Sequence, residues 1–154
     1  MCIRDRIYNT SAYNNLDIYQ INCTYYSALG DNDNAYLLAR AIQFFAPGIP
    51  QVYYVGMLAG KNDLELLEET KVGRNINRYY YTKEEVEMEI KRPVVHKLLE
   101  LMRFRNNHPA FNLDGSFKVE LENSNELKII REYKEDYAIL HANLKTFDFT
   151  IEHS

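Results

Sequence analysis

Residues 35–56 read AYLLARAIQFFAPGIPQVYYVG, and this stretch decides the fold class. Its first half repeats apolar residues at the spacing of one helical face, and Asp and Asn residues just before it offer N-cap side chains. Because Pro47 disfavours helical geometry in the residue before it, we expect a helix from Asp33 to about Ala46. The run QVYYVG after Pro50 has the composition of a strand buried on both faces. Helix, turn and buried strand predict an α/β protein whose parallel sheet is larger than 154 residues provide.

Two long loops flank this αβ unit. Residues 14–31 mix polar and aromatic residues without a helical or strand period, which predicts an ordered loop. Residues 56–81 predict a second loop, with one or two helical turns that start at Asn62 or Asp63. Loops of such length in compact domains are usually functional or disordered, and their aromatic content favours order here.

The remaining sequence predicts two helices and a small β-domain. Thr82 and Glu85 match the capping box, so a helix should follow to about residue 91. A second helix, with Pro93 in its first turn, should reach about residue 106. Four later runs have strand composition and predict an antiparallel meander: SFKVEL, ELKIIREY, DYAILHANL and FDFTIEH. The composition changes near residue 114, where we expect a domain boundary.

Composition and charge exclude several classes of protein. Apolar residues make up 46% and charged residues 26% of the chain, as in a folded globule rather than a disordered segment. The net charge of −4 has the wrong sign for a nucleic-acid-binding protein, and no apolar run is long enough to predict a membrane helix. Two cysteines, Cys2 and Cys23, fit a reducing compartment, and the opening residues lack the apolar core of a secretory signal. We therefore expect a cytoplasmic protein.

Tests for motifs leave no metal or cofactor site. Residues 56–61 resemble a phosphate-binding loop, but three residues separate the glycines where four are required. The four histidines never fall at metal-ligand spacing, and residues 31–33 begin like a calcium loop without its later glycine and glutamate. The thirteen tyrosines suit half-wet clefts, but packing at core edges and on strand faces is the commoner role of such residues. We therefore expect no cofactor and no metal.

Several longer stretches carry a resemblance to a known family: DIYQINCTYYSALG, AYLLARAIQFFAPGIPQVYYVG, LAGKNDLELL, GRNINRYYYT and KRPVV. Together they lie between Leu16 and Asn106. This region closely resembles sucrose phosphorylases, a transglycosylating branch of the α-amylase-like glycoside hydrolases. The wider superfamily shares only the PGIPQVYYVG-like segment, so the other stretches favour the phosphorylase branch.

The resemblance implies a (β/α)8 barrel followed by a small β-domain. A complete barrel takes about 250 residues, so residues 1–113 are expected to hold only about its last two units. In this interpretation QVYYVG is the eighth barrel strand, and residues 114–154 begin the antiparallel β-domain. The first six residues, MCIRDR, resemble nothing in the family and are interpreted as a foreign leader.

The resemblance also implies a reaction, in which sucrose and inorganic phosphate give glucose 1-phosphate and fructose by a double displacement with retention. Such a reaction needs at least two carboxylates on opposite sides of the glycosidic bond. In the family, the nucleophile, the acid/base and the aspartate that stabilises the transition state all precede the region represented here. We therefore expect no catalytic residue in this chain and no turnover by the chain alone. The oligomeric state stays open.

Acceptor-binding residues are implied by the match of Asp17, Ile18, Tyr19 and Gln20 to an Asp-Leu-Tyr-Gln loop of the family. In that loop the Asp and the Gln bind fructose hydroxyls, and the Tyr lies beside the exchanging fructose and phosphate. Ile18 is a mild departure. A role for Asp17 in a turn or a helix cap is the alternative.

Glucose binding is implied for Arg74, which matches the arginine that hydrogen-bonds glucosyl hydroxyls remote from the reacting carbon. A rigid fork with five donors can fix the orientation of a sugar without titrating. The alternative for Arg74 is an ion pair that tethers the loop. Tyr79 stands where the family often has His, so no ligand role is assigned to it.

Two further functions stay open on the sequence. One is a related enzyme: a phosphorylase for a phosphorylated fructose or a glycerate acceptor, or a hydrolase that admits water in place of phosphate. The other is a non-catalytic sugar-binding module.

Overall fold

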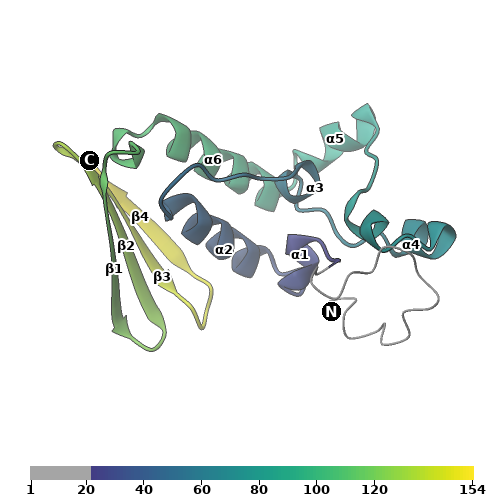
Figure 1. Ribbon diagram of the computed structural model, residues 1–154, viewed down its shortest axis with the longest axis horizontal. Helices are drawn as coiled ribbons and strands as arrows, with labels where there is room; N and C mark the ends of the chain where they lie inside the picture. Colours follow the sequence, from purple (N-terminus) through teal and green to yellow (C-terminus); the bar gives the residue numbers. More distant parts are fainter. Residues whose placement is uncertain (1–21) are drawn as a thin grey trace. The chain divides into compact units, whose positions relative to one another are not determined.

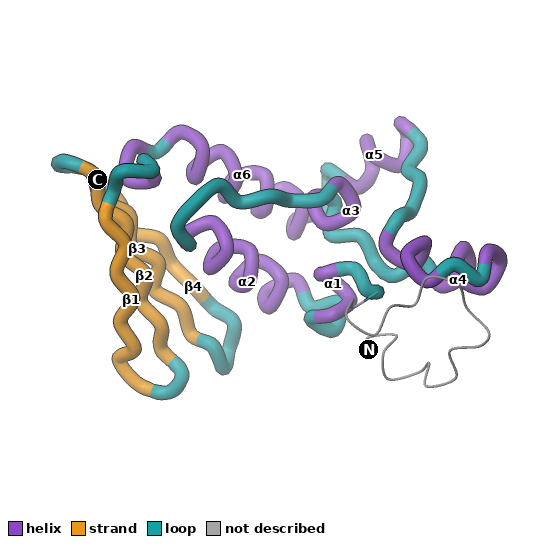
Figure 2. The backbone as a smooth tube through the Cα atoms, in the orientation of Figure 1, coloured by secondary structure: helices purple, strands orange, loops and turns teal. Residues whose placement is uncertain are grey.

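The computed structural model describes residues 22–154, which divide into two compact units. We call residues 22–36 and 52–95 the loop unit, and residues 37–51 and 96–154 the sheet unit. Figures 1 and 2 show the helices, strands and loops along the chain.

Short helices precede a four-stranded sheet in the chain (Figure 1). The helical segments are α1 (Tyr25–Ala28), α2 (Asp33–Phe45), α3 (Tyr54–Met57), α4 (Leu64–Thr70), the 3-10 turn η3 (Gly73–Asn77), α5 (Lys83–Glu89), α6 (Pro93–Asn107) and the 3-10 turn η4 (Pro109–Phe111). The strands are β1 (Ser116–Asn123), β2 (Glu126–Tyr133), β3 (Asp136–Asn143) and β4 (Phe149–His153).

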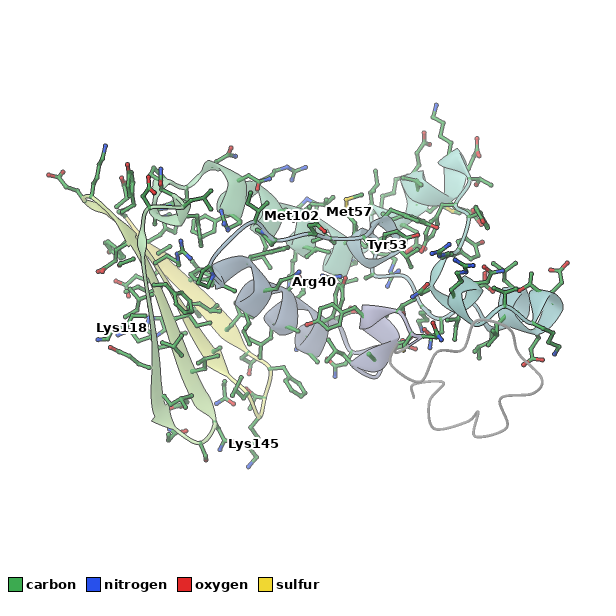
Figure 3. The ribbon with its side chains drawn as sticks, viewed as in Figure 1. Arg40, Tyr53, Met57, Met102, Lys118 and Lys145 are labelled. Atoms are coloured by element: carbon green, nitrogen blue, oxygen red, sulfur yellow. The ribbon has the colours of Figure 1, made fainter. Side chains whose placement is uncertain are left out.

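The sheet confirms the antiparallel meander expected from the sequence. Its strands lie in the order β1-β2-β3-β4, so each strand pairs with its neighbour in the chain. A two-residue turn joins β2 to β3, where Tyr133 pairs with Asp136 and Lys134 adopts a left-handed backbone with φ of 57°. Figure 3 labels Lys118 on β1 and Lys145 in the connection between β3 and β4.

The core of the sheet unit is one apolar cluster. It takes Leu38, Ala41 and Phe45 from α2, Ala110 and Phe111 from η4, and Ile129, Ala138, Leu140 and Ala142 from β2 and β3. The rings of Phe45 and Phe111 meet edge to face, with centroids 5.0 Å apart. Side chains on alternate positions of β3 are buried, as expected for a strand with one face on a core.

A buried arginine holds the segment after α2 in the sheet unit. Arg105 Nε donates to the Phe44 carbonyl oxygen at 2.8 Å, and its Nη2 donates to the Gly48 carbonyl oxygen at 2.9 Å. Gly48 has a φ of 94°, which a residue with a side chain rarely adopts. Helix α2 therefore ends where Pro47 and Gly48 predict, and the following turn is fixed by side-chain donors.

Several helix boundaries predicted from the sequence are confirmed. The Ala35 amide donates to Asn32 Oδ1 at 3.0 Å at the start of α2. Thr82 and Glu85 form both hydrogen bonds of the capping box before α5. Pro93 is the first residue of α6, where its missing N–H leaves no helical hydrogen bond unmade.

The buried strand predicted for QVYYVG is wrong for this structure. Residues 51–53 are irregular, and α3 begins at Tyr54. A parallel strand needs hydrogen-bonding neighbours, but every strand in the described part of the chain belongs to the antiparallel meander. Tyr53, labelled in Figure 3, is 54% exposed, so this run is not buried on both faces as predicted. Its strand-like composition did not identify a neighbouring strand to pair with.

The long loop predicted for residues 14–31 also needs correction. Its last part contains the short helix α1, whose N-cap Thr24 accepts a hydrogen bond from the Ser27 amide at 3.1 Å. The earlier part of this loop lies outside the described residues. No helix within residues 22–154 is long and apolar enough to cross a membrane.

Candidate functional site

Arg74 lies on the 3-10 turn η3 in the loop unit, and its neighbours fix the backbone of that turn. Gly73 and Ile76 are buried, and the Ile76 carbonyl oxygen accepts a hydrogen bond from the Asp63 amide at 2.8 Å. Asn75 Nδ2 donates to Thr70 Oγ1 at 3.0 Å. The Arg74 side chain is exposed, and within residues 22–154 it forms neither a hydrogen bond nor an ion pair. The tethering ion pair considered for Arg74 is therefore not formed in the described part of the chain.

Residues 60–63, Gly-Lys-Asn-Asp, form a short connecting segment that precedes α4, and we call it the GKND segment. Asp63 caps α4, because its Oδ1 accepts a hydrogen bond from the Leu66 amide at 2.9 Å. Lys61 Nζ lies 3.5 Å from Asp31 Oδ2. Lys61 is thus paired with a carboxylate of the segment before α2.

Asn62 of the GKND segment contacts the segment 23–27. Its Oδ1 accepts a hydrogen bond from the Thr24 amide at 2.7 Å, and its own amide donates to Ser27 Oγ at 3.1 Å. Asn62 Nδ2 lies 3.4 Å from Cys23 Sγ, within the range of a weak hydrogen bond to sulfur. Sequence analysis did not identify this residue, because its partners lie more than thirty positions away along the chain.

A cavity of about 770 Å³ opens in the loop unit, within the size range of small-molecule sites. Tyrosines and charged side chains dominate its lining: Tyr26, Asp33, Gly60, Lys61, Asn62, Asp63, Leu64, Glu65, Tyr79, Tyr81, Glu85, Glu89 and Arg92. The GKND segment lines this cavity, whereas Arg74 does not.

Hydrogen bonds between side chains order the cavity wall. Tyr26 Oη donates to Asp33 Oδ1 at 2.6 Å, and Tyr79 Oη donates to Glu85 Oε1 at 2.7 Å. Burial, followed by the hydrogen bond to Asp33, raises the pKa of Tyr26 to about 12, and burial likewise raises the pKa of Tyr81 to about 12. These hydroxyls therefore stay protonated at neutral pH, so they can donate hydrogen bonds but do not serve as bases.

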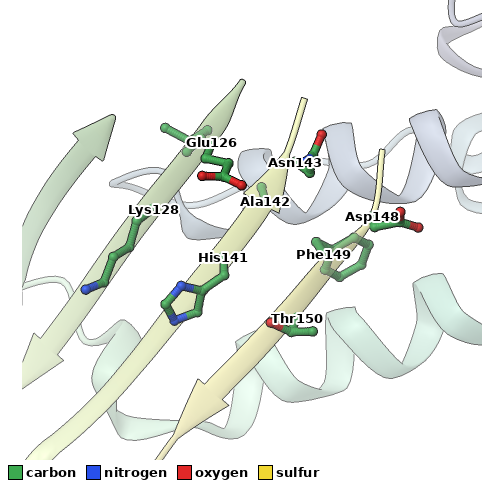
Figure 4. Close-up of a pocket in the computed structure, with 9 residues that line it drawn as sticks. Glu126, Lys128, His141, Ala142, Asn143, Asp148, Phe149 and Thr150 are labelled. Atoms are coloured by element: carbon green, nitrogen blue, oxygen red, sulfur yellow. The ribbon is translucent and has the colours of Figure 1, made fainter. Parts of the chain in front are cut away.

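A second, smaller cavity of about 310 Å³ lies on the sheet unit, and Figure 4 shows its lining side chains on β2, β3 and β4. His141 and Lys128 point from neighbouring strands there. His141 Nε2 lies 3.7 Å from Glu152 Oε2. No sequence motif anticipated this groove, and it contains none of the predicted site residues.

Three of the four predicted binding residues, Asp17, Tyr19 and Gln20, lie outside the described residues. Their sequence places Gln20 three positions before Cys23, the first residue that Asn62 contacts. No group of three or more His, Cys, Asp or Glu side chains in the described part of the chain is arranged to hold a metal ion.

Comparison with known proteins identifies close relatives, although no protein-family model matches the chain. Sucrose phosphorylase of Streptococcus mutans serotype c is 61% identical over 146 residues, which cover 95% of this chain and 30% of that protein. Glucosylglycerol phosphorylase of Marinobacter adhaerens is 54% identical over 127 residues, which cover 82% of this chain and 26% of that protein.

A solved structure gives the same result. The crystal structure of sucrose 6F-phosphate phosphorylase from Thermoanaerobacter thermosaccharolyticum matches with a TM-score of 0.84 and 51% identity, covering 87% of this chain and 27% of that chain. This chain therefore corresponds to the C-terminal part of the phosphorylase fold. It spans less than a third of the length of the relatives it matches, between 26% and 30% in these three comparisons.

Proposed function

This chain is related to the sucrose phosphorylases over nearly its whole length, and from that premise we propose that it acts as the C-terminal part of a sucrose phosphorylase. The observation that carries the proposal is 61% identity over 95% of the chain to the Streptococcus mutans enzyme. The proposed reaction moves the glucosyl group of sucrose to inorganic phosphate, with retention, through two displacements. Its products are glucose 1-phosphate and fructose.

Arg74 is proposed to orient the glucosyl group by donating hydrogen bonds to hydroxyls away from the reacting carbon. Two structural features support this role: η3 is held by the bond from Asp63 to Ile76, and the Arg74 guanidinium has no partner among the described residues. A guanidinium stays charged at all relevant pH values and offers donors in a fixed geometry. Arg74 therefore contributes binding and orientation rather than proton transfer.

Asp17 and Gln20 are proposed to bind the hydroxyls of fructose, and Tyr19 is proposed to lie where fructose and phosphate exchange. This part of the proposal comes from the match of residues 17–20 to the acceptor loop of sucrose phosphorylases. Residues 17–20 are therefore the positions at which related phosphorylases that use other acceptors are expected to differ from this chain.

The proposed architecture divides the enzyme between this chain and an upstream region. Residues 1–113 supply about the last two units of a (β/α)8 barrel, and residues 114–154 begin the β-domain. The upstream region supplies the nucleophile, the acid/base and the stabilising aspartate, so this chain alone should not turn over sucrose. A cytoplasmic location belongs to the same proposal and is supported by a content of two cysteines in 154 residues.

The test is a chimera in which this chain replaces the corresponding region of the Streptococcus mutans enzyme. We expect phosphate-dependent release of fructose from the chimera and none from the chain alone. Arg74→Ala in the chimera should lower kcat/KM for sucrose by about 10- to 100-fold, because a hydrogen bond to a charged group contributes about 1.5–3 kcal/mol. Arg103→Ala is the matched control, since Arg103 is an exposed arginine of α6 in the sheet unit.

Three results would count against the proposal: turnover by the chain alone, a chimera without phosphorolysis, or an Arg74→Ala chimera as fast as the parent. Product analysis with and without phosphate decides the acceptor. Free fructose and glucose 1-phosphate support a sucrose phosphorylase, whereas glucose as the main product in the presence of phosphate identifies a hydrolase.

A further inference from the structure

We propose that Asn62 is a positioning residue. It fixes the position of residues 23–27, which follow the proposed acceptor loop in the sequence, relative to the turn η3 that carries Arg74. The inference rests on the proposed function, because that proposal assigns the acceptor role to residues 17–20. It adds a residue that does not itself contact the sugar. Its basis is the set of hydrogen bonds around the GKND segment.

Asn62 forms hydrogen bonds to residues 23–27 through both its side chain and its backbone amide. The Thr24 amide and the Ser27 hydroxyl both bond to Asn62, at 2.7 Å and 3.1 Å. Thr24 and Ser27 are 4% and 7% exposed, so water does not readily replace these partners. Removing the Asn62 side chain would leave the Thr24 amide buried without its acceptor, which disfavours the present backbone position.

Other contacts within the segment 23–27 do not substitute for Asn62. Thr24 Oγ1 already accepts the Ser27 amide at 3.1 Å, and Ser27 Oγ donates to Asp31 Oδ1 at 2.7 Å. These bonds cap α1 and attach it to Asp31, in the turn before α2. Among the described residues, Asn62 joins this segment to the GKND segment through two hydrogen bonds that span more than thirty positions and a weaker contact with Cys23 Sγ.

The next residue extends the connection to Arg74. Asp63 donates its amide hydrogen to the Ile76 carbonyl oxygen at 2.8 Å and caps α4 with its side chain. Asn62 and Asp63 are adjacent, so the segment 23–27 and the turn η3 are anchored at neighbouring points of one backbone. A displaced Asn62 would change the position of one anchor relative to the other.

This geometry assigns Asn62 to the acceptor step rather than to glucosyl transfer. Cys23 follows Gln20 by three positions, so the segment that Asn62 holds is continuous with the proposed acceptor residues. Arg74 keeps its own anchor through Asp63 when only the Asn62 side chain is removed. Loss of that side chain should therefore impair use of phosphate and fructose more than hydrolysis, in which water is the acceptor.

The experiment compares phosphorolysis with hydrolysis of sucrose in the chimera described above. For Asn62→Ala we expect the ratio of the two rates to fall by about tenfold, since one net hydrogen bond contributes on the order of a factor of ten, with a higher KM for phosphate. Asn62→Asp keeps an oxygen for the Thr24 amide and should restore most of the ratio. Asn143→Ala is the control: Asn143 also accepts backbone amides through Oδ1, but in the hairpin between β3 and β4.

A second variant covers the case in which Asn62→Ala does not fold. Ser27→Ala removes the acceptor of the Asn62 amide together with the Ser27 hydrogen bond to Asp31, while the Asn62 side chain still accepts from the Thr24 amide. It should lower the ratio in the same direction by a smaller factor. An inactive parent chimera counts against the proposed function. An active parent whose Asn62 and Ser27 variants keep the wild-type ratio, or lose both rates equally, overturns the positioning role while leaving the proposed function intact.

Discussion

The loop unit and the sheet unit differ in the contacts that stabilise each of them internally. In the sheet unit, α2, η4 and the strands bury one apolar cluster, in which Ala138 and Leu140 are fully buried. In the loop unit, hydrogen bonds between side chains and backbone connect segments that are far apart in sequence. Asn62 and Thr24, for example, are separated by 38 positions.

This difference shows which part of the structure is determined by residues that lie close together in the sequence. Each strand of the sheet pairs with the next strand in the chain, so short turns and alternating apolar residues specify the register. The loop unit instead exposes large aromatic side chains, among them Tyr53 and Tyr80 at 54% and 77%. Arg74, the proposed binding residue within the described part of the chain, lies on η3, which is held by the hydrogen bond from the Asp63 amide to the Ile76 carbonyl oxygen.

The largest expected effect is in the sheet unit and tests whether its core is cooperative. Leu140→Ala should lower the free energy of unfolding of the chain by about 2–5 kcal/mol, because it leaves a cavity at a fully buried site. Urea unfolding followed by far-UV circular dichroism measures the change. The control is Leu121→Ala on β1, whose side chain is 69% exposed and whose effect should stay within about 0.5 kcal/mol. Equal effects of the two variants would contradict the assignment of Leu140 to a closely packed core of the sheet unit.

The second prediction concerns the segment QVYYVG, residues 51–56, most of which lies in the loop unit. In the chain alone, residues 51–53 are irregular and their amides should exchange with deuterium almost as fast as in a peptide. In the chimera, upstream strands would provide hydrogen-bonding neighbours, and protection should rise by about 100-fold, as for the interior of a sheet. Hydrogen-exchange mass spectrometry measures both, with β3 as the internal control because it is already paired on both sides. Unchanged exchange in an active chimera would show that this segment is not a barrel strand.

Elements with local signals could be predicted from the sequence. The capping box at Thr82 and Glu85, the end of α2 shortly before Pro47 and the four strands all follow from residues close together in the chain. The conformation of QVYYVG could not, because strand composition does not show whether a hydrogen-bonding neighbour is present.

The residues of the candidate site could not be predicted from local sequence patterns. Arg74 was found through resemblance to a family, since one exposed arginine on a loop carries no local pattern. Asn62 was missed because its contacts with the segment 23–27 form only when the chain folds. Local patterns thus predict the helices and hairpins, whereas the links between loops need the structure.

The smallest expected effect is a pH dependence of α5 in the loop unit. Glu85 accepts hydrogen bonds from the Thr82 amide and the Tyr79 hydroxyl, both at 2.7 Å. These bonds, the one from Thr82 first, hold the pKa of Glu85 below its usual value of 4.5. Because the pKa is lowered on folding, the carboxylate stabilises the start of α5 above about pH 4.5, and this stabilisation is lost as the pH falls through the lowered value.

Exchange of the α5 amides at pH 3 and pH 6, corrected for intrinsic rates, measures this loss. We expect less protection at the lower pH in residues 83–89, and no matching change in the interior of β3. Glu85→Gln is the control, because glutamine can also complete a capping box but does not titrate in this range. If the glutamine variant keeps the same pH dependence, the titrating group is not Glu85, and the start of α5 depends on another carboxylate of the loop unit.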